Sequence, residues 1–230
     1  MAASLASYES LPPVIAIDGP SASGKGAVAQ GVARRLGFHY LDSGALYRLV
    51  GLAALRAGLD TADEGAVAAL ARSLDFHFSG EHVYLDQQVV SDDIRSEAAS
   101  KAASEVGALP ELRRALVERQ RAFRSSPGLV AEGRDMGTVI FPDAVLKMYL
   151  TADAAERALR RYKQLIGKGM SANMAALLQE IRARDKRDTE RPVAPLQKSN
   201  DAILLDTTAL SIDQAVQEIV ARYRQISTRC

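Results

Sequence analysis

Two glycines, four intervening residues and a lysine stand near the start of the chain, at Gly19, Gly24 and Lys25. This spacing is typical of a phosphate-binding P-loop between a strand and a helix. The glycines let backbone N–H groups face the phosphates, the helix N-terminus adds partial positive charge, and the lysine neutralises the β/γ oxygens. The alternative is a glycine turn with a surface lysine. The residues expected to bind ATP here are Gly19, Pro20, Ser21, Ala22, Ser23, Gly24, Lys25, Gly26 and Ala27.

The loop lacks the hydroxyl residue that usually follows the P-loop lysine, because Gly26 and then Ala27 stand there. Mg²⁺, the expected cofactor, would then be held by ATP oxygens and water, with a carboxylate at the end of a strand. Glu132 follows the apolar run 129–131 and is the candidate for that contact through water. The alternative is a buried structural carboxylate paired with an arginine.

Basic residues are concentrated between residues 157 and 191, although the whole chain is balanced, with 29 Lys and Arg against 28 Asp and Glu. The balance argues against a nucleic-acid partner. The local density indicates an anionic ligand, because phosphoryl transfer builds charge that guanidinium groups stabilise in a dry site. For Arg160, Lys163 and Arg182 we favour a solvated helix face. The other members of the cluster are Arg157, Arg161, Arg184, Arg187 and Arg191.

Two further places in the sequence suit a second phosphate, one at Ser43 with Arg48 and the other at Arg134. Ser43 stands at a predicted helix start, where a hydroxyl and free backbone N–H groups suit a monophosphate, and Arg48 lies later on that helix. Ser43 could instead be a plain N-cap. Arg134 and Asp135 follow an apolar strand at its carboxyl end, where ligands bind in open α/β sheets. Asp135 could alternatively form a salt bridge with a nearby arginine.

The elements that must position these residues alternate between strands and helices, which predicts a parallel sheet of about five strands covered on both faces. Thr61 and Glu64 have capping-box spacing, and Pro110 suits the first position of a helix. A period of two between residues 74 and 90 predicts a small antiparallel insert. The expected strands of the main sheet are 14–17, 38–41, 129–131, 145–150 and 202–205.

Four segments together resemble the bacterial cytidylate kinases, which are P-loop nucleoside monophosphate kinases. The likeness runs from about Val14 to about Tyr223, and the period-two insert is similar to the extra small sheet of that family. It implies ATP-dependent transfer of a phosphoryl group to CMP or dCMP, with an acceptor-side insert at about 74–108 and an arginine-rich lid at about 157–191. The segments are Asp18 to Gly26, Leu41 to Arg48, Gly133 to Thr138, and Arg184 to Asp188 with Arg191-Pro192.

The resemblance also implies roles for individual residues. It places Asp188 at the sugar hydroxyls and Asp135 at the cytosine ring, where a carboxylate accepts from the N4 donor and would repel the carbonyl of uracil. Ser104 and Arg113 would also contact cytosine, although a surface helix face is the alternative for both. The implied catalytic groups are Lys25, Arg134, Arg184 and Arg191, with the three arginines, Ser43 and Arg48 on CMP, and with Arg157 and Arg161 on ATP.

The remaining features predict a soluble cytoplasmic monomer with one P-loop kinase domain at 12–230 and a flexible tail at 1–11. The only cysteine is Cys230, and the sequence contains no apolar run of membrane-spanning length. One rival function is a P-loop kinase for a different monophosphate or metabolite. Another is a nucleotide-dependent switch, which would leave the arginine groups unexplained and, if it used GTP, would need an Asn-Lys-x-Asp motif that we do not find.

Overall fold

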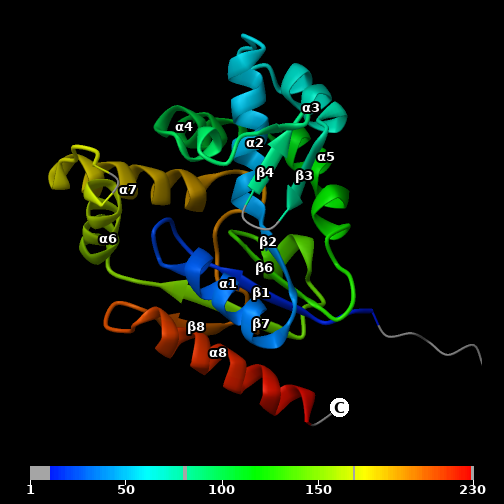
Figure 1. Cartoon of the computed structure of the whole chain (residues 1–230), viewed down its shortest axis with the longest axis vertical. Helices are drawn as coiled ribbons and strands as arrows, with labels where there is room; N and C mark the ends of the chain where they lie inside the picture. Colours follow the sequence, from blue (N-terminus) through cyan, green and yellow to red (C-terminus); the bar gives the residue numbers. More distant parts are fainter. Residues whose placement is uncertain (1–10, 80–81, 168, 229–230) are drawn as a thin grey trace, which may run out of the picture.

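The computed structural model describes residues 11–79, 82–167 and 169–228, so Cys230 and all of the predicted tail except Leu11 lie outside the described residues. A parallel sheet of five strands forms the centre of the chain (Figure 1). The predicted parallel sheet is therefore confirmed. Its strands, in spatial order, are β2 (His39–Asp42), β6 (Leu129–Gly133), β1 (Val14–Asp18), β7 (Leu146–Thr151) and β8 (Ile203–Asp206).

Strand β1 is buried on both faces because alternate side chains enter two different cores. Val14 and Ala16 pack with one hydrophobic cluster, and Ile15 and Ile17 pack with the other. Helices α1 (Lys25–Leu36) and α8 (Ile212–Ser227) cover the second face, and α2 (Ser43–Arg56) belongs to the first (Figure 1). This two-sided burial explains why the strands read as short apolar runs.

The region between α2 and β6 contains the antiparallel insert predicted at residues 74–90. It carries a separate antiparallel sheet in the order β3-β4-β5, as the period of two predicts. Pro110 is the first residue of α5, which confirms that assignment. The elements are α3 (Glu64–Ser73), β3 (Phe76–Ser79), β4 (His82–Leu85), β5 (Gln88–Val89), a 3₁₀ turn (Asp93–Arg95), α4 (Glu97–Val106) and α5 (Pro110–Arg121).

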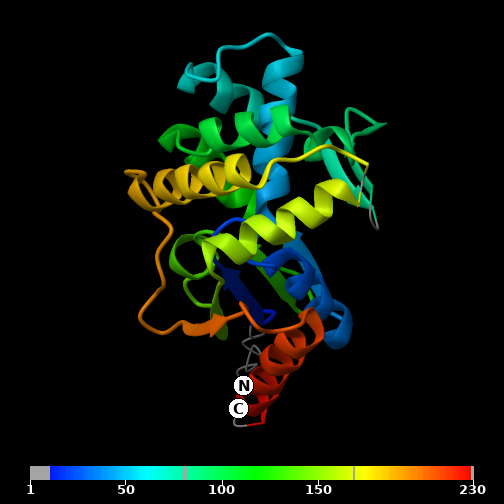
Figure 2. The ribbon, with the colours of Figure 1, turned by 90° about the vertical axis from the view of Figure 1, so that its left-hand side faces the viewer.

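Two long helices, α6 (Ala154–Ile166) and α7 (Met174–Glu190), project to one side between the main sheet and the insert (Figures 1 and 2). Ala158, Leu177 and Ile181 form a small core of their own between these helices. Most of the predicted arginine cluster lies on this pair. Across the described ranges 11–79, 82–167 and 169–228, no helix combines the length and the apolar composition needed to cross a membrane.

Two predicted helix caps are wrong. Asp42, not Ser43, caps α2, since its carboxylate accepts the N–H of Ala45 at 3.0 Å. Thr61 does not form a capping box with Glu64, because Asp63 caps α3 and the Thr61 hydroxyl donates to Glu105 instead. In both places an aspartate lay directly before the helix, and a carboxylate accepts at least as well as a hydroxyl there.

Candidate active site

The carboxyl ends of β1, β2 and β6 meet beneath α7 around a cavity of about 690 Å³. The predicted P-loop leaves β1 here, and Gly24 caps α1 with φ at 86°, a conformation that favours glycine. Gly19 has no room for a side chain, because a Cβ would lie 2.0 Å from the carbonyl oxygen of Leu150. Predicted residues that line this cavity include Ser21, Lys25, Ser43, Arg48, Ser104, Arg113, Glu132, Arg134, Asp135, Arg161, Arg184, Asp188 and Arg191.

Lys25 is the first residue of α1 and is turned back over the loop. Its Nζ donates to the carbonyl oxygen of Pro20 at 3.3 Å and lies 3.7 Å from Oε2 of Glu132. Burial lowers the pKa of Lys25 to about 8, with Arg134 adding to the shift and Glu132 opposing it. The Lys25 ammonium group is largely shielded from solvent, so a bound anion would stabilise its charge.

We expect kcat/KM for ATP to fall as the pH rises above about 8. The lowered pKa of Lys25 means that the free protein loses this ammonium charge above that value, and a neutral amine cannot offset phosphate charge. The fall of kcat/KM at high pH reports the pKa of the free enzyme, whereas kcat reports the enzyme–substrate complex. We therefore expect kcat to be less affected. The measurement is the pH profile of both parameters between pH 7 and 10; parallel falls in kcat and kcat/KM would contradict the assignment.

Glu132 fills the space in which a P-loop hydroxyl would otherwise lie. A Cβ on Gly26 would stand 3.1 Å from Oε1 of Glu132, and Tyr40 donates its hydroxyl to the same oxygen at 3.1 Å. Burial raises the pKa of Glu132, with Asp42 adding to the effect and Lys25 opposing it. The alternative of a buried carboxylate paired with an arginine is right about burial but wrong about the partner, since the ion pair is with Lys25.

The donor set suits a magnesium ion only if phosphates complete it. Within the described part of the chain no group of three or more His, Cys, Asp or Glu side chains could hold a metal ion. Mg²⁺ is commonly bound by one or two carboxylates together with substrate phosphates and water. Glu132, next to Lys25 in the cavity, fits that pattern.

Asp135 is buried between two arginines at the insert side of the cavity. Arg113 donates to its Oδ2, and a terminal nitrogen of Arg191 lies 3.6 Å from its Oδ1. Arg113 is 5% exposed and lies over the ring of Tyr47, so the surface alternative for Arg113 is wrong. The buried hydroxyl of Ser104 has no hydrogen-bond partner among the described residues. A polar ligand bound here would meet a buried carboxylate, two guanidinium groups and a hydroxyl whose hydrogen-bonding capacity is unused.

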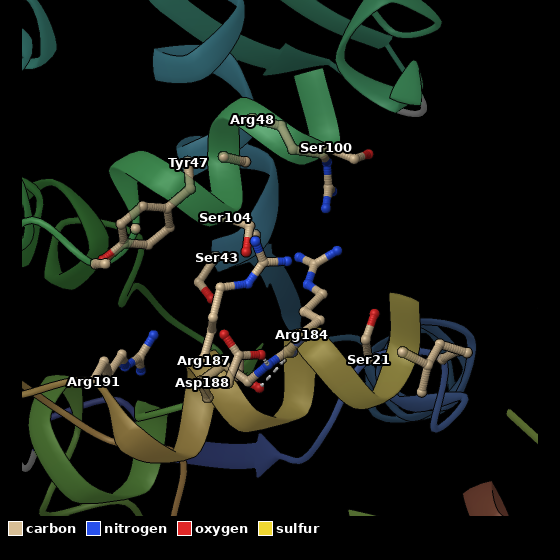
Figure 3. Close-up of a pocket in the computed structure, with 18 of the residues that line it drawn as sticks. Ser21, Ser43, Tyr47, Arg48, Ser100, Ser104, Arg184, Arg187, Asp188 and Arg191 are labelled. Carbon is tan, nitrogen blue, oxygen red and sulfur yellow. Dashed lines mark hydrogen bonds and ion pairs between the residues drawn. The ribbon is translucent and has the colours of Figure 1, made fainter. Parts of the chain in front are cut away.

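The floor of the cavity holds an excess of positive charge. Arg134 donates to Asp188 at 2.7 Å and Arg48 to Asp42 at 2.6 Å, but Arg184 makes no ion pair with any described residue and its buried Nε has no partner. Figure 3 shows Arg48 and Arg184 reaching from α2 and α7 into the same space. Burial, with help from Arg134, lowers the pKa of Arg184 to about 10. An anion in this space would relieve that repulsion.

Helix α6 supplies arginines to the P-loop side of the cavity, and one assignment there is only partly right. Arg160 is only partly solvated: it makes an ion pair with Glu156 one turn earlier at 3.0 Å, but it also donates to the carbonyl oxygen of Ser23 at 3.4 Å and to the hydroxyl of Thr207 at 3.2 Å. Arg157 is buried, with its guanidinium on Asp185 and on the carbonyl oxygen of Ser21. Arg161 lines the main cavity and also a second one of about 720 Å³, bordered by Arg160, residues 22–28 and residues 207–212.

Sequence reasoning missed several residues that shape the site. Asp42 lies in one of the four resembling segments but was given no role, and Tyr40, two positions earlier on the same strand, was not considered. Asp185 belongs to a quoted motif, but its partner Arg157 is 28 positions away and on another helix. Thr207 follows β8, and its position after a strand end is the one signal that could have suggested it.

Comparison with known proteins finds relatives over nearly the whole chain. The sequence profile described as Cytidylate kinase matches residues 15–225. The chain is 58% identical to the cytidylate kinase of Bordetella bronchiseptica over 92% of this chain and 95% of that protein, and 58% identical to that of Chromobacterium violaceum over 93% and 96%. A crystal structure of a gluconokinase from Sinorhizobium meliloti covers 95% of both chains with a TM-score of 0.50 at 16% identity, a likeness in fold alone.

Proposed function

Because the chain belongs to the cytidylate kinase family, its reaction is the ATP-dependent phosphorylation of CMP and dCMP, and we propose that the cavity at the carboxyl end of the sheet carries out this reaction. The observation that supports this site best is the buried carboxylate of Asp135, held by Arg113 beside a group of cations that includes Arg184. Base recognition and phosphate binding would then occur in one continuous space. A switch function would leave this second, acceptor-side group of charges without a role.

On the donor side, the P-loop amides and Lys25 would bind the β- and γ-phosphates of ATP. The second cavity, which shares Ala22, Lys25 and Gly26 with the first, suits the rest of the nucleotide. Arg160 and Arg161 border it from α6, and Arg157 would act by holding the loop at Ser21. Mg²⁺, when bound to the ATP phosphates, would offset charge that develops on the transferring oxygens.

On the acceptor side, Asp135 would accept a hydrogen bond from the exocyclic N4 amine of cytosine, and Arg113 and Ser104 would make the other contacts to the ring. Ser43, Arg48, Arg134, Arg184 and Arg191 would bind the acceptor phosphate, and Asp188 the sugar hydroxyls. Arg134 is paired with Asp188, and Arg48 with Asp42. When CMP binds, each arginine would either leave its aspartate or contact the phosphate and the aspartate together. The attacking phosphate oxygen of CMP would then meet the γ-phosphorus in line, forming CDP and releasing ADP.

Closure of α6 and α7 over both nucleotides would exclude water, which competes with CMP as acceptor. These helices carry the predicted lid at 157–191 and have a small core of their own, so they could move as a unit. The insert at 74–108 would hold the acceptor side within the single domain at 12–230. Both sides of the site come from one chain, which supports a monomer, and the nucleotide substrates favour a cytoplasmic location.

Replacing Glu132 by glutamine should raise the Mg²⁺ concentration for half-maximal rate about tenfold, because the amide is a weaker partner for a hydrated cation. The affinity for CMP, measured without metal by calorimetry, should stay within about twofold, since the change lies on the donor side. Glu118→Gln, on the exposed face of α5, is the matched control. An unchanged Mg²⁺ dependence in Glu132→Gln would remove this residue from the metal site.

The proposed reaction is tested by its products. Purified protein, ATP, Mg²⁺ and CMP should give CDP and ADP in equal amounts, resolved by anion-exchange chromatography. ADP accompanied by inorganic phosphate, with CMP unchanged, would mean that water is the acceptor and that the proposed site does not position CMP.

A further inference from the structure

Asp18 is a buried carboxylate that the reaction described above does not use. It is the last residue of β1, and the residue is 6% exposed. Its two oxygens accept from the backbone N–H groups of Met136 and Gly137, both at 2.8 Å. These are consecutive donors at the start of a one-turn π-helix, Met136–Ile140, and the carboxylate satisfies both of them.

The position of Asp18 in the chain joins two parts of the site. The next residue, Gly19, begins the phosphate-binding loop, and Met136 directly follows Asp135. Gly19 packs directly against the backbone of Leu150, so the start of the loop has little room to shift. The sheet already pairs Asp18 with Gly133, and the carboxylate adds a second attachment at Met136 and Gly137. Arg134 and Asp135, which lie between these two points, are thereby held relative to the start of the P-loop.

Burying the charged form of Asp18 is energetically unfavourable, because the carboxylate loses its contact with water. Burial raises the pKa of Asp18 to about 6; Asp135 adds to the shift, while the two backbone N–H groups and Arg134 oppose it. The other titratable group that faces it is Tyr149 on β7. A neutral asparagine would avoid the desolvation, but its amide nitrogen would face a backbone N–H, so it could not serve both donors as the carboxylate does.

We propose, on the basis of the proposed function, that Asp18 is a positioning residue that holds Arg134 and Asp135, just beyond the end of β6, in place relative to the phosphate-binding loop. In-line transfer needs the reacting atoms about 3–3.5 Å apart, and a misplacement of about 1 Å can cost about 100-fold in rate. Asp18 touches neither substrate in this account. It acts through the backbone of Met136 and Gly137.

The test is Asp18→Asn, with Asp63→Asn as the matched control because Asp63 also accepts a backbone N–H, at the exposed start of α3. For Asp18→Asn we expect about a tenfold higher KM for CMP and about a tenfold lower kcat, with KM for ATP within about twofold. The ratio of kcat/KM for CMP between wild type and variant should shrink as the pH falls from 8 to 5, because protonated Asp18 resembles asparagine. Ionisation of CMP is common to both enzymes and cancels in this ratio.

An unchanged KM for CMP, or a ratio independent of pH, would overturn the proposal and leave Asp18 a structural cap. If the variant does not fold, NMR of the wild type decides: the amide shifts of Arg134 and Asp135 should titrate near pH 6 together with those of Met136 and Gly137. Shifts of Arg134 and Asp135 that stay constant from pH 5 to 8 would overturn the proposal. Absence of CDP from wild-type reactions would contradict the proposed function instead, and the NMR titration would still report on Asp18.

Discussion

Replacing Asp135 by asparagine should lower kcat/KM for CMP about 1,000-fold, a loss of about 4 kcal/mol, while the rate with UMP falls far less. The carboxylate is buried and is the group proposed to accept the N4 amine of cytosine. An asparagine presents an amide that can donate to the O4 carbonyl of uracil, so the penalty against UMP is relieved. The ratio of kcat/KM for CMP to that for UMP should therefore drop at least about 100-fold.

The same substitution leaves the buried Arg113 without its charged partner, so Asp135→Asn should also lower the free energy of unfolding by about 3 kcal/mol. Thermal unfolding separates this effect from specificity, because instability lowers both rates and leaves their ratio unchanged. Asp143→Asn is the matched control, since it removes an exposed carboxylate that also pairs with an arginine. If the ratio of kcat/KM for CMP to that for UMP is unchanged in Asp135→Asn, Asp135 does not recognise the base.

Replacing Arg184 by methionine should lower kcat about 1,000-fold and at the same time stabilise the nucleotide-free protein. Arg184 has no ion-pair partner among the described residues, and repulsion from Arg134 adds to its desolvation. Its guanidinium stays charged at neutral pH in the folded and unfolded states, so folding carries the cost of burying it. Removing the charge should raise stability by about 1–2 kcal/mol, or about 2–6 °C in Tm.

Arg182→Met is the control for Arg184→Met, because Arg182 lies on the same helix with its side chain in solvent. It should change neither kcat nor Tm appreciably. The opposite signs at Arg184 make the test selective, since ordinary damage to the fold lowers both activity and stability. A fall in Tm together with kcat would mean that Arg184 serves packing rather than the phosphate.

The parallel sheet could be predicted because its strands are short apolar runs between amphipathic helices, a pattern that burial on both faces produces directly. The P-loop was predictable for a related reason: Gly19, Gly24 and Lys25 act through local backbone geometry, which spacing encodes. Order along the chain also located Arg134 and Asp135, since ligands gather where parallel strands end.

Pairings between distant side chains were not predictable from spacing. Arg160 was assigned to a solvated helix face, yet most of its hydrogen bonds are to Thr207 and Thr208, the first of them 47 positions later. Arg113 was taken as equally suited to a surface, because nothing local indicates that α5 turns it toward Asp135. The link from Asp18 to Met136 spans 118 positions. Such contacts depend on tertiary packing, which overrides local pattern.

The most direct test of the central claim is ADP release from ATP and Mg²⁺ by the purified protein with CMP, dCMP, UMP, AMP, GMP or no acceptor, at matched concentrations. The account predicts rapid turnover with CMP and dCMP, weak turnover with UMP, and none above background with the purine nucleotides. Equal slow ATP hydrolysis in every reaction would contradict it, because a site built around Asp135 and the arginines must distinguish cytosine from the other bases.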